Sequence, residues 1–230
     1  MSGVPDGGAH GLGSMIGPVM IGPSSSHTAG VVRIGRTVAG ILGGMPDRVE
    51  IIFYNSFART YEGHGSDRAV IAGLMDFSAD DIRIKKSLDL AKTAGLAFKF
   101  KSIGNASTFH PNTIQISAKK KDETIKLIGE SRGGGVIRIK EIDGFAANFT
   151  TSLHTLIVTG VDVKGSIGYL ANILSQDDCN IATMTVSRKG KNDDACQIIE
   201  MDSGLQDLTI EYIKNLNWVH KVKYIPVIDS

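Results

Sequence analysis

The chain has 230 residues, with 25 lysine and arginine residues against 24 aspartate and glutamate residues, so its formal net charge is +1. This balance argues against a broad electrostatic grip on nucleic acid, and no window approaches the roughly 20 apolar residues of a membrane span. Two cysteines are too few for a disulfide scaffold or a cysteine-built cluster. With no recognisable signal peptide, we expect a cytoplasmic protein, and its length favours two small domains.

Residues 1–14 have no hydrophobic periodicity and precede a second methionine, Met15. We interpret them as a vector-derived leader and exclude them from the fold. Residues 15–150 are expected to form an α+β domain with an antiparallel sheet. Apolar spacing of three to four residues predicts helices over 28–42, 67–75 and 87–95. Alternating runs predict strands at VEIIFYN, LAFKFKSI, TIQISAK, ETIKLIG and VIRIKEI.

A second domain is expected over residues 153–227, where strand and helix patterns follow each other regularly. HTLIVTGV is typical of a strand and SIGYLANILSQ of an amphipathic helix, while CNIATMTVSR and ACQIIEMD are typical of two strands joined by a polar turn. LQDLTIEYIKNL and VHKVKYIPV supply a second helix and a last strand. The order β-α-β-β-α-β predicts a ferredoxin-like fold.

The first functional candidate is a serine-rich segment, GPSSSHTAG, at the start of the first predicted helix. Its hydroxyl groups belong to Ser24, Ser25, Ser26 and Thr28, and His27 lies among them. Free backbone N–H groups and the positive end of the helix dipole favour a carboxylate or a phosphate at such a position. Ordinary N-capping by one serine is the alternative.

Two further loops each present a histidine among small residues. Glycines flank His64 in YEGHGSDR, where Ser66 adds a hydroxyl group; a simple helix cap by Asp67 is the alternative for this segment. His110 lies with Asn112 in the loop GNASTFHPNT. With the histidine of the serine-rich segment, these loops indicate an acid/base or carboxylate-binding site, or as a poorer alternative a three-histidine metal site. For each histidine alone, a solvated side chain without a role is the alternative.

The second domain contains one candidate loop, VDVKGSI, between its first strand and first helix. Backbone N–H groups near Gly165 and Ser166 suit the carboxylate of a small zwitterion, and Asp162 suits its ammonium group, while Lys164 completes the loop. A simple capped turn is the alternative. Elsewhere, the three glycines at 133–135 predict a tight hairpin turn, and the two cysteines are expected to be packed thiols.

Four segments and the second domain occur in an order that resembles a known family. The segments are MIGPVMIGPSSSHTAG, NSFARTYEGHGSDRA, FHPNT and GESRGGG. The chain resembles, from Met15 to its end, the beta chain of the two-chain, iron–sulfur-dependent L-serine dehydratases (L-serine ammonia-lyases). The resemblance implies a serine dehydratase beta domain over residues 15–150, similar to the allosteric substrate-binding domain of some phosphoglycerate dehydrogenases, and an ACT domain over residues 153–227.

The resemblance also implies a reaction, a cofactor and partners. The family converts L-serine to pyruvate and ammonia, a step of amino-acid catabolism that we relate to gluconeogenesis. It uses a [4Fe–4S] cluster, whose open iron is expected to bind the serine hydroxyl group. The cluster cysteines belong to the alpha chain, so we expect no metal ligand in this chain and no activity of this chain alone. Expected partners are L-serine, the alpha chain and a second copy through ACT domains, but neither nucleic acid nor a membrane.

The family's site roles are carried over by position. His64 is the expected base, with His27 and His110 as supporting acid/base or orienting groups. The expected substrate-binding residues are Ser24, Ser25, Ser26, Thr28, Ser66 and Asn112, and the expected ACT ligand loop comprises Asp162, Lys164, Gly165 and Ser166. The sequence departs from the family pattern at Ser66, where threonine is frequent, and at Lys164, where proline is frequent.

A function of a different class fits the same loops. The chain would then be a non-catalytic serine-sensing module that allosterically controls a partner enzyme. Such a module needs different affinities for serine in two states of the assembly. Binding a carboxylate does not by itself imply catalysis, so the chemistry of the loops leaves both functions open.

Overall fold

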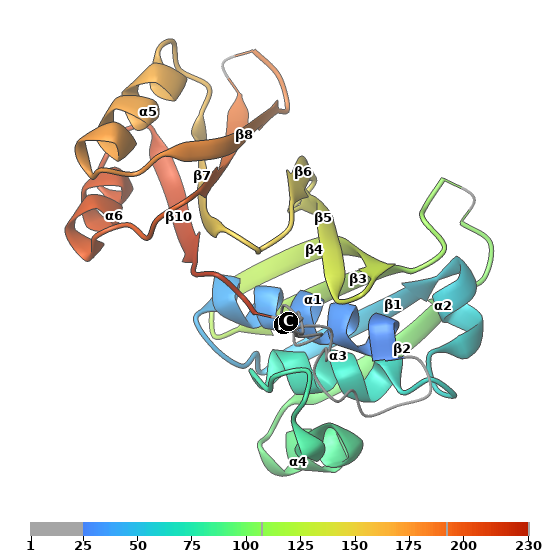
Figure 1. Cartoon of the computed structure of the whole chain (residues 1–230). Helices are drawn as coiled ribbons and strands as arrows, with labels where there is room; N and C mark the ends of the chain where they lie inside the picture. Colours follow the sequence, from blue (N-terminus) through green and yellow to red (C-terminus); the bar gives the residue numbers. More distant parts are fainter. Residues whose placement is uncertain (1–24, 107, 192, 230) are drawn as a thin grey trace, which may run out of the picture.

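A computed structural model describes residues 25–106, 108–191 and 193–229, in two units (Figure 1). The expected leader and Ser24 lie outside the described residues. The N-terminal unit contains α1 (Ser25–Leu42), β1 (Arg48–Tyr54), α2 (Asn55–Thr60), α3 (Ser66–Leu74), the 3-10 helix η1 (Ile82–Lys86), α4 (Ser87–Thr93), β2 (Ala97–Ile103), β3 (Thr113–Lys120), β4 (Glu123–Gly133), β5 (Val136–Ile142) and β6 (Phe145–Phe149). The C-terminal unit contains β7 (His154–Val161), α5 (Ser166–Gln176), β8 (Ile181–Arg188), β9 (Asp194–Met201), α6 (Asp207–Lys214) and β10 (Val219–Ile225). Within these ranges, no helix combines the length and apolar character that crossing a membrane requires.

The N-terminal unit is built on a six-stranded sheet with the strand order β2-β1-β3-β4-β5-β6. Neighbouring strands are antiparallel except for β1 and β2, which are parallel. The expectation of an antiparallel sheet is wrong for this pair, because α3, η1 and α4 form a crossover that returns the chain to the sheet in the same direction. The sequence patterns also miss α2 and β6, which have only six and five residues.

The helices α1 and α3 cover one face of this sheet (Figure 1). Strand residues that face the helices are buried: Val49, Ile51 and Phe53 of β1 are at most 1% exposed. The alternate residue Glu50 lies on the open face, where its carboxylate is 2.8 Å from the ammonium group of Lys101. The alternation of apolar and polar residues in β1 therefore decides which face receives the helices.

The helices α1 and α3 touch through their backbones. A Cβ atom on Gly73 of α3 would lie 2.1 Å from the carbonyl oxygen of Val32, and one on Gly35 of α1 would lie 2.6 Å from that of Val70. Only glycine permits so close an approach. Because α1 leads into the start of β1 and α3 follows its end, both helices run antiparallel to β1 and begin at the same end of the sheet (Figure 1).

The C-terminal unit has a four-stranded antiparallel sheet with the order β10-β7-β9-β8. The helices α5 and α6 cover one face of it, and the core between them includes Leu156, Leu170, Leu174, Ile199 and Ile213. The element order β-α-β-β-α-β confirms the expected ferredoxin-like fold.

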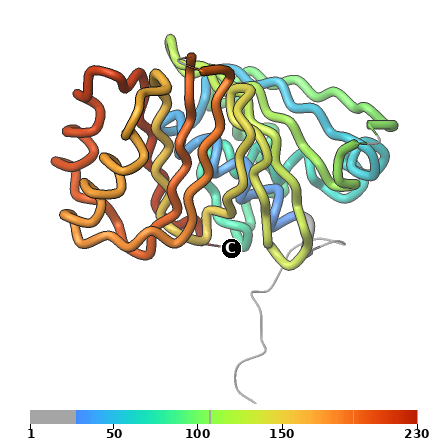
Figure 2. Tube along the Cα trace, turned by 90° about the horizontal axis from the view of Figure 1, so that it is seen from above, coloured from blue at the N-terminus to red at the C-terminus, as the bar shows by residue number. Residues whose placement is uncertain are grey.

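The other face of this second sheet packs against the N-terminal unit. Phe145 and Phe149 of β6 belong to the same buried cluster as Ile157, Cys196 and Ile198 of the C-terminal sheet. Figure 2 shows the strands of the two units side by side, with β6 next to the C-terminal sheet. The core of the N-terminal unit therefore continues onto this face of the C-terminal sheet.

Hydrogen bonds also attach the connecting segment 150–152 to both units. The buried Arg33 of α1 donates to the carbonyl oxygen of Gly135 (2.9 Å) and to the hydroxyl group of Ser152 (3.2 Å). The N–H and hydroxyl groups of Thr150 donate to Oε1 of the buried Glu200 in β9, at 3.0 and 3.2 Å. Burial lowers the pKa of Arg33, since a guanidinium group loses hydration there, and the oxygen acceptors compensate in part. These bonds fix the connection between the units beside the β4–β5 turn.

The backbone contact between α1 and α3 predicts that Gly73→Ala destabilises the chain by about 3 kcal/mol, because the added methyl group meets the main chain of Val32. Gly168→Ala in α5 is the matched control. A Cβ atom there meets nothing within 4 Å, so alanine should stabilise the helix by about 0.5–1 kcal/mol. Urea unfolding measures the free energy of unfolding of both variants. A change for Gly73→Ala as small as that for Gly168→Ala would contradict the contact.

Candidate functional site

Four short segments lie at the end of the sheet where β1 ends (Figure 1). They are the first turn of α1, the turn 61–65 between α2 and α3, the loop 104–112 between β2 and β3, and the turn 133–135 between β4 and β5. Strand register brings the last two together, since Thr113 of β3 pairs with Glu130 of β4. Because open sheets with parallel strands bind ligands beyond the carboxyl ends of those strands, we take this end as the candidate site.

The serine-rich segment enters the helix itself. The helix α1 begins at Ser25, so Ser25, Ser26 and His27 belong to its first turn. Their side chains, and the whole of Ser24, lie outside the described residues, while Thr28 is buried with 8% of its surface exposed. The first N–H groups of a helix have no partners within the helix. The anion site expected here stays a prediction. The start of α1 lies at the end of the sheet that we take as the candidate site.

Ser131 of β4 connects α1 with the loop 104–112. Its backbone N–H donates to the carbonyl oxygen of Asn112 (3.0 Å). Its side chain lies against α1, where a Cβ atom on Gly30 would be 2.3 Å from the Ser131 hydroxyl oxygen. Within the described part of the chain this buried hydroxyl group has no hydrogen-bond partner. Residue type alone does not single out Ser131, and its place follows from the pairing of β3 with β4.

Asn55, the first residue of α2, holds the loop 104–112 through its side chain. Its Nδ2 donates to the carbonyl oxygens of Ala106 and Phe109, both at 2.9 Å, and its Oδ1 accepts the N–H of Ala106 at 2.8 Å. Its backbone has a φ of +53°, which asparagine tolerates better than most residues. Sequence reasoning missed this residue. The available signal was an asparagine between a strand and a helix, because its amide can both donate and accept hydrogen bonds.

His110 is half-buried in this loop. Its ring Nδ1 accepts the backbone N–H of Asn112 (3.2 Å), and its carbonyl oxygen accepts the hydroxyl group of Thr113 (2.8 Å). Beside it, the ring of Phe109 packs edge-on against Tyr54, with 4.9 Å between centroids. The position of the imidazole is therefore set by main-chain hydrogen bonds and by aromatic packing on β1.

His64 lies on the turn between α2 and α3, and its side chain is exposed. The backbone of the turn is well held: the N–H of His64 donates to the carbonyl oxygen of Thr60 (2.9 Å), and the N–H of Ser66 donates to that of Tyr61 (2.8 Å). Ser66 itself is buried. An exposed imidazole on a fixed turn can reach a ligand without a change of fold.

Asp67 follows as a buried carboxyl group in the first turn of α3. Gly65, with a φ of +71°, holds the N-cap position of α3, so the alternative of a helix cap by Asp67 is wrong. Burial raises the pKa of Asp67, although its Oδ1 accepts the N–H of Arg68 (2.8 Å). Groups with shifted pKa values are frequent at functional sites, and Asp67 lies beside the turn of the candidate base.

The three expected histidines come from three of the segments at this end of the N-terminal unit (Figure 1). His27 lies on α1, His64 on the turn before α3, and His110 on the loop before β3. Asn112 is joined to both His110 and Ser131 by the bonds above. The close approach of the three imidazole rings stays a prediction, because the side chain of His27 lies outside the described residues.

The candidate loop of the C-terminal unit uses its polar groups within the protein. The carboxylate of Asp162 accepts a hydrogen bond from Arg188 (3.2 Å), and the buried hydroxyl group of Ser166 accepts one from a glutamine amide of β9 (3.1 Å). Gly165, with a φ of +88°, is the N-cap of α5, and Lys164 is exposed. A role of this loop in ligand binding stays a prediction.

The cysteines of this chain do not fit an iron–sulfur cluster. Both are buried: Cys179 in the turn after α5 and Cys196 in β9. Burial raises the pKa of Cys196 to about 11, so this group is a neutral thiol near pH 7, whereas clusters are bound by thiolates. Among the described residues, no three histidine, cysteine, aspartate or glutamate side chains are grouped so that they could hold a metal ion.

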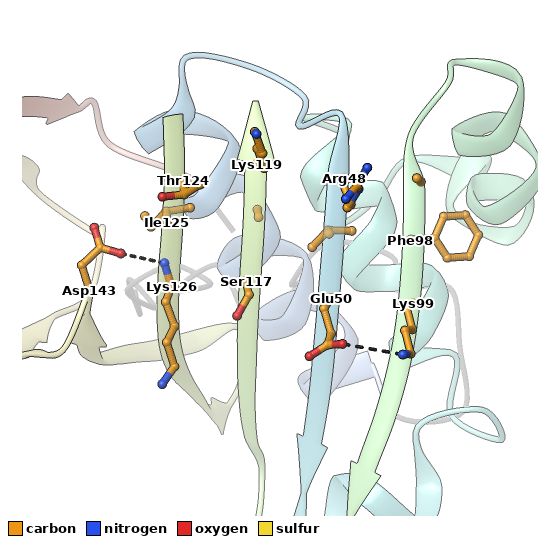
Figure 3. A pocket seen from close by; sticks show the side chains of 13 residues that line it. Arg48, Glu50, Phe98, Lys99, Ser117, Lys119, Thr124, Ile125, Lys126 and Asp143 are labelled. Atoms are coloured by element: carbon orange, nitrogen blue, oxygen red, sulfur yellow. Dashed lines mark hydrogen bonds and ion pairs between the residues drawn. The ribbon is translucent and has the colours of Figure 1, made fainter. Parts of the chain in front are cut away.

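A pocket of about 530 Å³ lies on the sheet near the start of β1 and the end of β3 (Figure 3). Figure 3 shows Glu50 paired with Lys99 and the backbone N–H of Lys126 bonded to Asp143. Four of the charged residues that line this pocket, Glu50, Lys99, Lys126 and Asp143, thus have partners within the protein. The pocket is at the opposite end of β1 from the three histidine segments, so it is separate from the candidate site.

Comparisons with known proteins match the chain as a whole. The family model for the serine dehydratase beta chain matches residues 16–94. The probable L-serine dehydratase beta chain of Bacillus subtilis is 40% identical over 202 residues, covering 88% of this chain and 91% of that protein. The L-serine dehydratase beta chain of Peptoniphilus asaccharolyticus is 33% identical over 214 residues, covering 93% and 96%. A solved ACT domain from the GTP pyrophosphokinase of Chlorobium tepidum covers 32% of this chain and 96% of its own, at 17% identity and a TM-score of 0.27.

The raised pKa of Asp67 predicts that Asp67→Asn increases stability at neutral pH more than at acid pH. The folded chain binds this proton more tightly than the unfolded chain, so its stability falls as the pH rises from the unfolded to the folded pKa. Thermal unfolding across this range measures the effect. Glu123→Gln is a control of opposite sign, because Lys223 lowers the pKa of Glu123 and its contribution grows with pH. A larger gain for Asp67→Asn at acid pH would contradict the prediction.

Proposed function

This chain belongs to the family of L-serine dehydratase beta chains, and on this premise we propose that it is the beta subunit of an L-serine ammonia-lyase, acting together with an alpha subunit. The observation that carries the proposal is the gathering of the three histidine segments at one end of the sheet (Figure 1). These segments occur in a chain that matches such beta chains over more than nine-tenths of their length. The proposed reaction converts L-serine to pyruvate and ammonia in the cytoplasm.

The start of α1 is the proposed binding place for the substrate carboxylate. Its first N–H groups and the helix dipole favour an anion there. Ser24, Ser25 and Ser26 supply hydroxyl donors, and Ser66 and Asn112 are further polar groups of the proposed site. Thr28 completes the set of proposed substrate-binding residues.

His64 is the proposed base, because its imidazole is exposed on a turn that backbone hydrogen bonds hold in place. It takes the α-proton of serine, and the β-hydroxyl group accepts a proton from an acid group of the site and leaves as water, which gives aminoacrylate. Aminoacrylate becomes the imine and adds water, giving pyruvate and ammonia. His27 and His110 support these proton transfers or orient the substrate.

The [4Fe–4S] cluster is proposed to belong to the alpha chain. The two buried cysteines of this chain do not fit it, as described above. The ACT unit is proposed to associate with a second copy, because β8 and β10 are edge strands of its sheet and edge strands favour further pairing. The active assembly would then contain both kinds of chain.

The proposed role of His64 predicts that His64→Ala, expressed with the alpha chain, lowers turnover at saturating serine by about 10²–10⁴-fold, the usual contribution of a general base. Lys92→Ala is the control, since Lys92 is an exposed residue near the end of α4, outside the proposed site. Steady-state kinetics on both variants measure the effect.

The same kinetics separate catalysis from serine sensing. A sensor role predicts a changed dependence on serine concentration with residual turnover at saturation. Loss of turnover at saturating serine, with the control unchanged, supports the base. Full turnover of His64→Ala would reject it.

The proposed place of the cluster predicts that the purified chain alone is colourless, contains no stoichiometric iron or sulfide, and forms no pyruvate from serine. Its thiols are too few and too buried to bind a cluster. Anaerobic reconstitution followed by iron and sulfide analysis measures this, with the alpha chain treated in parallel. Stoichiometric iron in the isolated chain would contradict the proposal.

A further inference from the structure

His110 is held in a loop that is attached to the junction between β1 and α2. The carbonyl oxygen of Pro111 accepts the N–H groups of Ser56 (3.0 Å) and Phe57 (3.3 Å) at the start of α2. Asn55 precedes them and reaches back to the loop with its side chain. The residues around His110 are therefore attached to the end of β1 by both main-chain and side-chain hydrogen bonds.

The orientation of the Asn55 amide follows from its partners. Its nitrogen faces the carbonyl oxygens of Ala106 (2.9 Å), Phe109 (2.9 Å) and His110 (3.5 Å). Its oxygen faces the N–H of Ala106 (2.8 Å). Since a carbonyl oxygen accepts and does not donate, the reverse orientation would leave these groups mismatched. Only a side chain with both donors and an acceptor satisfies this set.

The ring of His110 is fixed in one tautomer by its neighbour. The N–H of Asn112 donates to Nδ1 at 3.2 Å, so Nδ1 contributes its lone pair and carries no proton in this geometry. In a neutral imidazole one nitrogen donates and the other accepts, so the proton is on Nε2. A ring held in this form offers an N–H donor at Nε2 and has no lone pair there.

We propose that Asn55 is a positioning residue that, with the Asn112 N–H, holds His110 as the Nε2–H tautomer, so that His110 donates a hydrogen bond to an oxygen atom of a β-hydroxy-α-amino acid substrate. The proposal rests on the function proposed above and assigns one role among those left open for His110. A ring in this form does not accept the α-proton at Nε2. Proton abstraction then belongs to another group of the site.

The tautomer is tested first on the full chain, without substrate or partner. Ring-nitrogen NMR on the ¹⁵N-histidine-labelled chain distinguishes the two neutral tautomers and the charged ring, and His110→Gln identifies the signal. We expect a protonated Nε2 and an unprotonated Nδ1 at neutral pH. A ring with its proton on Nδ1, or with both nitrogens protonated, would overturn the proposal.

The role of Asn55 is tested with two variants that keep its backbone geometry. Asn55→Gly permits a φ of +53° but removes every side-chain bond, and Asn55→Asp keeps the shape and the acceptor but removes the donors. Both should mix the His110 tautomers. In the complex with the alpha chain, both should lower kcat by about 10- to 100-fold with little change in KM, as expected for a misplaced reacting group. Lys121→Gly, at a φ of +52° in the β3–β4 turn, is the matched control.

The outcomes separate this proposal from the proposed function. If the Asn55 variants lower the melting temperature but leave both the tautomer and kcat unchanged, Asn55 is only structural and the proposal fails. If the wild-type complex does not turn over serine, the proposed function fails, while the NMR experiment still decides whether Asn55 sets the tautomer of His110. Equal effects in Lys121→Gly would also reject a specific role for Asn55.

Discussion

The main-chain contact between α1 and α3 is the constraint on which the rest of the N-terminal unit depends. Gly35 and Gly73 let the two helices approach until carbonyl oxygens replace side chains in the interface. Both helices then lie over the same face of the sheet and start beyond the same strand ends (Figure 1). The hydroxyl-rich first turn of α1 and the turn that bears His64 are brought to the same end of the sheet by this packing.

The histidines of this end are supported mainly by the main chain. His110 receives an N–H from Asn112, and the turn of His64 is closed by bonds to the carbonyl oxygens of α2. Such support leaves little freedom in short segments between regular elements. The amide of Asn55 adds to this support, because it satisfies main-chain groups of the loop 104–112.

Much of this architecture could be predicted from periodicity, and the exceptions have physical causes. The order of the C-terminal elements follows from apolar spacing. The strands β7 and β9 are buried on both faces. A continuous apolar run such as LIV in β7 indicates that both faces of a strand are covered, but it does not identify the elements that cover them. Strand order and the parallel pairing of β1 with β2 depend on contacts between distant segments. The histidine loops stand out by residue type, whereas Asn55 and Ser131 act through geometry that only the folded chain provides.

The packing between the two units gives Cys196 an unusual position. Cys196 is 1% exposed, and it lies on the sheet face that the N-terminal unit covers. A thiol reagent reaches it only when the two units separate or the strand opens, so its labelling rate reports how often the boundary opens under native conditions. The chain thus carries its own probe of motion between the units, at a residue with no proposed role in chemistry. Changes in that rate on adding serine or the alpha chain would reveal coupling without any alteration of the site.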